Sequence, residues 1–264
     1  MTGERMKGLS ILLHAISMVT SNLNAALRIS GVLMGVQFVL AVLLGVQFIY
    51  MGTDTSAMMM AGTYPYASAG LVVIIQAVST LWIAVAWHRF ILREEQPGAA
   101  LPAFNGAAIL SYLWAGIIFV LVLIVVAIPF GILAGILAAP MMASPTAGSA
   151  TVSGLILFLV LWLPVTYISY RISPILPSAA LQERIALKEA WYATGTSGAA
   201  FVVLAVASVL AVWVINLPVM LLAQLSTFLA FIWAFVVQWA VLLVGVSVLT
   251  TIYGHYVEKR ALNV

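Results

Sequence analysis

Six long apolar stretches constrain the fold of this chain more than any other feature of its sequence. They cover residues 29–51, 69–90, 109–129 or beyond, 152–170, 200–222 and 228–253. About 20 apolar residues in a helix cross the ~30 Å hydrocarbon layer, where backbone groups must find their partners within the protein. Only 6% of the residues are charged, against about 25% in a soluble domain. The sequence therefore predicts an all-α fold, a polytopic bundle of six transmembrane helices that forms a single membrane domain, residues 1–264.

Lysine and arginine are distributed in a way that orients the bundle. Of the segments that flank the apolar stretches, only alternate ones carry basic residues, which are Arg5, Lys7 and Arg28, then Arg89 and Arg93, then the basic residues of 171–188, and finally Lys259 and Arg260. Loops rich in basic residues stay on the cytoplasmic side. We therefore expect a multi-pass protein of the bacterial inner membrane with both termini in the cytoplasm. The net charge of +3 is explained by these loops beside anionic lipid, so we expect no nucleic-acid partner.

Two segments are expected to lie on the membrane surface. Residues 8–24 alternate apolar and polar side chains at helical spacing, which predicts an interfacial helix before the first span. A signal peptide is the alternative. Residues 171–195 form the longest polar stretch, and after its prolines Ser178 is suited to cap an amphipathic helix that ends at Tyr192. We expect this helix in a cytoplasmic surface segment.

A short motif recurs where the odd-numbered spans begin. Residues 24–27, 106–109 and 198–201 each place a small or polar residue before two alanines and a large apolar residue. The even-numbered spans end in aromatic and basic residues, as at Trp87-His88-Arg89-Phe90 and Tyr170-Arg171. These side chains are suited to the headgroup level of the membrane. The pattern favours three hairpins of one orientation, although alanine pairs are common in such a composition.

The sequence offers no clear catalytic, metal or cofactor site. There is no cysteine, and His14, His88 and His255 lie on separate segments without a nearby set of ligands. We expect these histidines to act as interfacial anchors and expect no cofactor. A membrane enzyme that uses His88, His255 and a glutamate is a third hypothesis, and it requires these groups to lie within hydrogen-bond distance of one another.

Polar and helix-breaking residues inside the spans support an alternative function. Pro129, Pro164 and Pro218 interrupt three spans, and the amides of Gln76, Asn216 or Gln238 would face a cavity in a transporter or lipid-handling protein. Amides between helices serve more often as interhelical hydrogen bonds. Two glycine pairs have the spacing of close helix contacts, Gly31 with Gly35 and Gly131 with Gly135.

Several motifs resemble a known group of membrane proteins. They are Trp87-His88-Arg89-Phe90 with Glu94, Arg171-Ile172-Ser173, Leu176-Pro177, Ala179-Ala180, and Leu187-Lys188-Glu189-Ala190-Trp191 ending at Gly195. In these motifs the chain is similar to uncharacterised bacterial inner-membrane proteins of the YciC-like type and to the membrane domain fused to some glycerophosphodiester phosphodiesterases. The resemblance implies six helices and transfers no catalytic residue.

Together these features predict a non-catalytic membrane protein that acts by contact, as a scaffold, assembly factor or accessory subunit of a membrane complex. Its partners would be membrane lipids and other membrane proteins. The candidate contact rim consists of Trp87, His88, Arg89, Glu94, Arg171, Glu189 and Trp191. We expect Trp87, Arg89, Arg171 and Trp191 to cluster at one membrane face, with an arginine paired to Glu94 or Glu189. The same groups would also suit a lipid phosphate or a protein partner.

The charge pattern generates a topology prediction. A reporter fused at Val264 should be active only in the cytoplasm, and a cysteine placed at Ser144 should react only from the periplasmic side, because every basic residue belongs to the alternate segments. Labelling of that cysteine from the cytoplasm would overturn the orientation.

Overall fold

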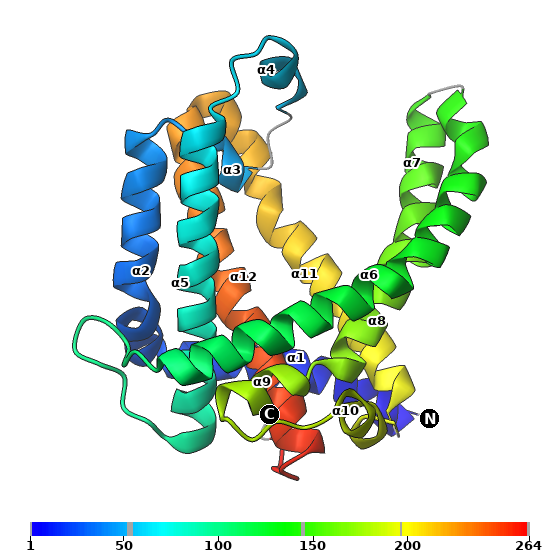
Figure 1. Ribbon diagram of the computed structural model, residues 1–264. Coiled ribbons are helices and arrows are strands. Elements are labelled where there is room, and N and C mark those ends of the chain that lie inside the picture. The colour runs from blue at the N-terminus through cyan, green and yellow to red at the C-terminus, as the bar shows by residue number, and fades with distance from the viewer. Residues whose placement is uncertain (1, 52–54, 144–145, 196, 263–264) are drawn as a thin grey trace. The chain divides into compact units, whose positions relative to one another are not determined.

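The computed structural model describes residues 2–51, 55–143, 146–195 and 197–262, and these contain helices and connecting turns but no strand (Figure 1). The elements in chain order are α1 (Thr2–Ser21), α2 (Leu23–Leu43), α3 (Phe48–Met51), α4 (Ser56–Met60), α5 (Tyr66–Arg93), α6 (Gly106–Ala143), α7 (Ala147–Ile156), the π-helix η1 (Leu157–Trp162), α8 (Leu163–Ile172), α9 (Ile175–Ala180), α10 (Leu187–Ala193), α11 (Gly198–Leu225) and α12 (Thr227–Tyr256). Ser144 and Val264, which enter the topology prediction, lie outside the described residues.

Six helical stretches are long and apolar enough to cross a membrane. They are Leu23–Leu43, Tyr66–Arg93, Gly106–Met141, Gly148–Ile172, Gly198–Leu225 and Thr227–Tyr256. The predicted fold class is confirmed. Helix α1 contains most of the predicted segment 8–24, and its location at the membrane surface stays a prediction.

The first span begins and ends earlier in the chain than predicted. The apolar run reaches Met51, but α2 stops at Leu43 because Gly45 adopts a left-handed conformation with φ of 66°. The N–H groups of Gly45 and Val46 then donate to the carbonyls of Val42 and Ala41. This is the Schellman arrangement that satisfies the last carbonyls of a helix, so a glycine ends the span inside an apolar run.

The chain divides into two compact units. Unit 1 comprises residues 1–14, 110–208 and 249–264, and unit 2 comprises residues 15–109 and 209–248. The long helices α11 and α12 contribute to both.

Unit 2 is organised around α2, α5 and residues 227–248 of α12. Helix α2 packs along α5, side by side in Figure 1. Helix α12 joins α2 where the indole N–H of Trp239 donates to Ser30 Oγ at 2.7 Å and where the rings of Phe38 and Phe231 stack at 5.0 Å. A hydroxyl shared between helices removes a polar group from lipid, which stabilises the pair.

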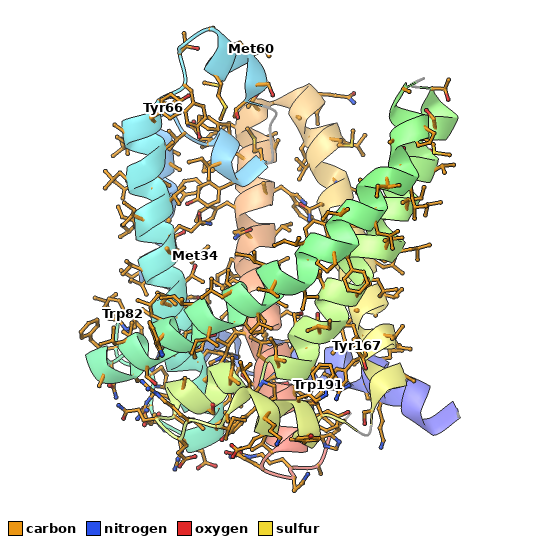
Figure 2. All side chains as sticks on the ribbon, turned by 45° about the vertical axis from the view of Figure 1, so that its right-hand side comes forward. Met34, Met60, Tyr66, Trp82, Tyr167 and Trp191 are labelled. Carbon is orange, nitrogen blue, oxygen red and sulfur yellow. The ribbon has the colours of Figure 1, made fainter. Side chains whose placement is uncertain are left out.

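Unit 1 contains the second predicted hairpin, α6 followed by α7, η1 and α8. The outer parts of α6 and α7 lie side by side in Figures 1 and 2. The returning span is a continuous helical stretch with a wider π turn at residues 157–162, immediately before Pro164. A proline has no N–H to donate and interrupts the α-helical hydrogen bonds, and a π turn at this place gives the helix another pairing pattern.

The segment 171–195 differs from the prediction. The expected continuous helix from Ser178 to Tyr192 is wrong, because α9 ends at Ala180, Gln182 adopts a left-handed conformation, and α10 starts only at Leu187. Ser178 is fully buried, and its Oγ lies 2.9 Å from the Ile175 carbonyl and accepts the Ile185 N–H at 3.4 Å. It therefore holds the turn between two short helices and does not start a long one.

The predicted repeat motifs share one feature of packing. The second alanine of each motif, Ala26, Ala108 and Ala200, is 0% exposed. Helices α6 and α11 begin at the first residue of their motifs. The common burial supports the repeat, which stays a hypothesis.

Close approach of helices occurs at a glycine that the spacing did not single out. The expectation of contacts at Gly31 and Gly35 is wrong, because no neighbouring atom lies within 4 Å of a Cβ built at either position. A Cβ at Gly8 of α1 would instead lie 2.2 Å from the Ala200 carbonyl oxygen of α11. Backbone therefore meets backbone here, and only glycine fits.

Replacing Gly8 by alanine should destabilise the protein, because the methyl group would force α1 away from α11 at a cost of about 1–3 kcal/mol. Gly35→Ala is the matched control, since its Cβ has open space and alanine favours a helix by about 1 kcal/mol. Thermal unfolding in detergent measures both. Equal midpoints for the two variants would contradict the close contact.

Candidate functional site

The residues of the predicted rim fall into two groups. Trp87, His88, Arg89 and Glu94 belong to unit 2, whereas Arg171, Glu189 and Trp191 belong to unit 1. The expected meeting of both groups at one membrane face stays a prediction.

Arg171 is the centre of the group in unit 1. It lies in the last turn of α8, and the residue is only 6% exposed. Its Nε–H donates to Thr194 Oγ1 at 3.0 Å, its Nη1 to the Tyr167 hydroxyl at 2.9 Å, and its Nη2 to the Trp191 carbonyl at 2.8 Å. Tyr167 precedes it by one helical turn, and the other two acceptors belong to or follow α10. Arg171 thus ties α10 to the end of α8.

Aromatic faces also surround this guanidinium. Its central carbon lies 4.0 Å from the centroid of a Trp191 ring and 5.8 Å from that of Tyr167. A cation over an aromatic face gains about 0.5–2 kcal/mol, more where water is excluded. Figure 2 labels both aromatic residues. The planar guanidinium is suited to stacking and to several hydrogen bonds at once.

Of the arginine pairings expected with Glu94 or Glu189, the one between Arg171 and Glu189 is not formed. Glu189 Oε2 accepts the backbone N–H of Ala186 at 2.9 Å and so caps the start of α10. Within the described part of the chain, no carboxylate oxygen lies within 4 Å of Arg171. The buried cation is therefore held by neutral acceptors and aromatic rings.

Thr194 completes this cluster, although the sequence did not single it out. The residue is 0% exposed, and its hydroxyl lies 2.9 Å from the carbonyl oxygens of both Arg171 and Ala190. Because it also accepts the Nε–H of Arg171, one small side chain joins the ends of two helices. A threonine near the end of a helix commonly bonds the carbonyl one turn earlier, but this local pattern does not predict the contact of Thr194 with a second helix.

Trp87 and His88 are buried and are not anchors exposed to lipid headgroups. Both are 0% exposed. The indole N–H of Trp87 donates to Ser247 Oγ at 2.8 Å, which joins α5 to α12. The headgroup expectation is therefore wrong for these two rings. Aromatic residues at a membrane boundary are common on the lipid side, but the one-dimensional pattern cannot distinguish that side from the side that packs inward.

Arg89 pairs with Glu95 and not with the expected Glu94. Its Nε–H donates to Glu95 Oε2 at 2.8 Å, and Nη2 contacts Oε1 in a two-pronged arrangement. Glu94 adopts a left-handed conformation with φ of 54° at the end of α5, which turns the chain and brings the next carboxylate back. The side chains are 18% and 45% exposed, so the pair contributes at most about 1 kcal/mol.

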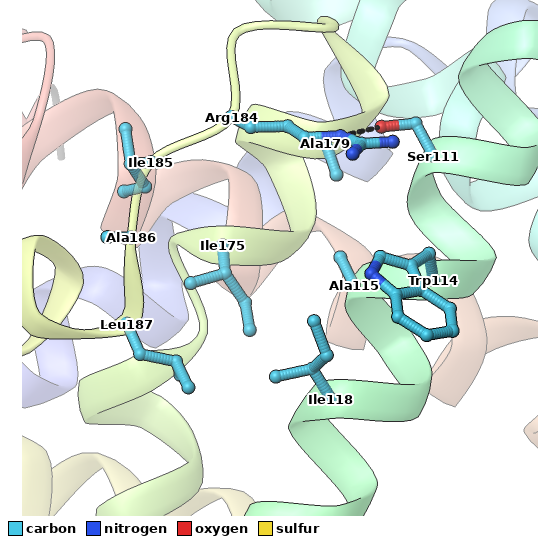
Figure 3. Close-up of a pocket in the computed structure, with 10 residues that line it drawn as sticks. All are labelled: Ser111, Trp114, Ala115, Ile118, Ile175, Ala179, Arg184, Ile185, Ala186 and Leu187. Carbon is cyan, nitrogen blue, oxygen red and sulfur yellow. Dashed lines mark hydrogen bonds between the residues drawn. The ribbon is translucent and has the colours of Figure 1, made fainter.

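Each unit also contains a cavity. In unit 2, a cavity of about 310 Å³ is bounded by Ile29, Arg89, Glu95 and the loop that follows α5. In unit 1, a cavity of about 230 Å³ lies between α6 and the segment from α9 to the start of α10 (Figure 3). Arg184 stands beside it, and its Nε–H donates to Ser111 Oγ at 3.0 Å.

The histidines are not gathered into a metal site in the described ranges. Across residues 2–51, 55–143, 146–195 and 197–262, no group of three or more His, Asp or Glu side chains has the spacing to hold a metal ion. His255 Nδ1 lies 2.9 Å from the Arg260 carbonyl oxygen, and His88 is buried in unit 2.

The structure generates a prediction that separates the two arginines. Arg171→Ala should lower the stability in detergent by on the order of 3 kcal/mol, because it removes three hydrogen bonds and the stacking of a buried guanidinium on Trp191. Arg89→Ala should cost under about 1 kcal/mol. Arg171→Lys keeps the charge but loses the planar fork, so it should recover little of the loss.

Thermal unfolding of the three purified variants beside the parent measures these differences. Full recovery by lysine would show that charge alone matters at Arg171. Unchanged stability in both alanine variants would contradict a structural role and leave recognition of a lipid or a partner as the better explanation.

Comparison of the chain with protein-family models, with the curated proteins and with the solved structures found no match. The resemblance to YciC-like proteins stays a prediction.

Proposed function

We propose that this integral membrane protein is non-catalytic and acts through contact with other membrane proteins, as a scaffold, assembly factor or accessory subunit. Its six apolar helices place it among multi-pass membrane proteins. We further propose the bacterial inner membrane, both termini in the cytoplasm and kinship with the YciC-like group, on the basis of the charge pattern and the motifs.

The exposed hairpin of unit 1 is the main support for this proposal. In the most apolar window of Gly106–Met141 only 6% of the residues are buried, and in that of Gly148–Ile172 none is. The corresponding share is 22–39% in the other four spans. The third and fourth spans therefore contribute little surface to the interior of the chain.

Lipid alone does not favour the association of such helices. Acyl chains are as apolar as leucine, so helices in a bilayer associate through close packing and interhelical hydrogen bonds. The hairpin of unit 1 makes few such contacts within the chain, and a helix from another protein would supply them. The size of this unpacked surface favours a contact role.

Exposed amides on α11 and α12 support the same conclusion. Asn216 and Gln238 are exposed in the middle of apolar helices, and the amide of Asn216 donates to the Val212 carbonyl of its own helix. Polar side chains on transmembrane helices stabilise contacts with other helices. Here they are available to a second protein.

A transporter or lipid-handling function is the second candidate. The π-helix η1 and the following Pro164 interrupt the α-helical pattern of one span, and interrupted helices form binding sites in transporters. The exposed positions of Asn216 and Gln238 count against this candidate, because its substrate would need polar groups enclosed within the protein.

A pair of photo-crosslinking positions tests the contact function in native membranes. A photoreactive residue at Ile136 of α6 should form a discrete adduct with another membrane protein, whereas the same residue at Ile74 of α5 should react with lipid. The two side chains are 66% and 64% exposed, so exposure is matched and only the helix differs.

Mass spectrometry of the adducts identifies what is bound. Reaction with lipid alone at both positions, together with extraction of a solitary chain in lipid nanodiscs, would contradict the proposal. An adduct of Ile136 with a second copy of this chain alone would limit the surface to self-association and would contradict an accessory-subunit role.

A further inference from the structure

We propose that the cavity beside Arg184 binds an anionic phospholipid, with the phosphate at the guanidinium and part of an acyl chain against the apolar walls. This inference goes beyond the contact function and would hold whether or not the protein has protein partners.

The cation at this cavity has no anionic partner among the residues that the structure describes. Arg184 donates one hydrogen bond, to the neutral hydroxyl of Ser111. Across the described ranges, no carboxylate oxygen lies within 4 Å of it. A guanidinium has five N–H donors, so most of them remain for an external acceptor. A phosphate oxygen is a fitting acceptor because arginine binds phosphate in a two-pronged geometry.

The walls of the cavity are apolar and continue away from the cation. On α6, Trp114, Ala115 and Ile118 follow Ser111 at the spacing of one helix face. Ile175 and Leu187 line the opposite side. Figure 3 shows Ser111 and Arg184 together at one end, with Ile118 and Leu187 at the other. This polarity matches an amphiphile with an anionic head and is poorly suited to a fully hydrated ion.

The size and location of the cavity favour a lipid that is only partly enclosed. A volume of about 230 Å³ is smaller than pockets that bury a whole ligand, about 300–1,000 Å³. Trp114 is 56% exposed, so one wall is open toward the bilayer. Ser111 lies in the second turn of the membrane-spanning helix α6, the level at which tryptophan and lipid headgroups meet. A phospholipid could therefore reach the guanidinium without leaving the bilayer.

Native mass spectrometry of delipidated protein in detergent tests the site, with phosphatidylglycerol as the anionic probe and phosphatidylcholine as the zwitterionic one. Arg184→Gln should weaken the tightest phosphatidylglycerol binding at least about tenfold, as loss of charged hydrogen bonds implies. Lys188→Gln removes the same charge from an exposed residue outside the cavity and should bind like the parent. Phosphatidylcholine should bind weakly to all three proteins.

A variant that fills the cavity keeps the charge and tests the acyl chain. Ala115→Trp should also weaken phosphatidylglycerol binding while Arg184 stays in place. Gel filtration of each variant verifies that it remains folded. Equal affinity of the parent for both lipids, or parent-like binding by Arg184→Gln, would overturn the proposal.

Inorganic phosphate separates the lipid from a free ion. Millimolar phosphate that displaces phosphatidylglycerol from the parent, with Ala115→Trp binding the lipid normally, would identify a phosphate site and overturn the lipid assignment. None of these outcomes depends on the crosslinking at Ile136, so the two proposals fail separately.

Discussion

The absence of water from the hydrocarbon layer is the constraint from which the rest of this structure follows. Each apolar stretch must satisfy its backbone groups internally, and the six spans of the described residues do so as helices. The same constraint applies to polar side chains. Indole N–H groups of Trp87 and Trp239 donate to serine hydroxyls on neighbouring helices, and the Tyr170 hydroxyl donates to Ser208. Serine paired with a large aromatic ring thus joins helices in both units.

The buried arginine of unit 1 shows how the chain manages charge where carboxylates are scarce. A buried cation without compensation is costly, and the usual solution is an acidic partner. Arg171 has instead a hydroxyl, a phenol, a carbonyl and two rings. Because no carboxylate takes part in this cluster, it does not depend on an ion pair that salt would screen or acid would protonate. It holds α8 and α10 in a fixed relation, on which the wall of the neighbouring cavity depends through Leu187.

Hydrophobic length was sufficient to predict the helices, whereas the details of packing were not predictable. The six spans and their order follow from apolar runs alone, but Gly45 shortened the first by a local conformation that a run of apolar residues conceals. The periodicity of apolar residues suggested a helix from Ser178 to Tyr192, but it did not indicate that Ser178 is buried. Glu94 and Glu95 are equivalent in sequence, and only the turn at Glu94 decides which one reaches Arg89. Ser247 and Thr194 are too distant along the chain from Trp87 and Arg171 to be paired with them.

The π turn before Pro164 affects the direction, around the helix axis, in which the later side chains of the same span project. Successive residues of an α-helix rotate by about 100° around the axis, and in the wider turn of η1 each residue rotates less. After six residues the angular lag is large enough to redirect a whole side of α8. Tyr167 and Arg171 lie one turn apart in α8, after this change in winding, and Arg171 contacts the Trp191 carbonyl of α10. The winding of a short apolar stretch in the fourth span thus influences the direction in which an arginine several turns later projects from the helix.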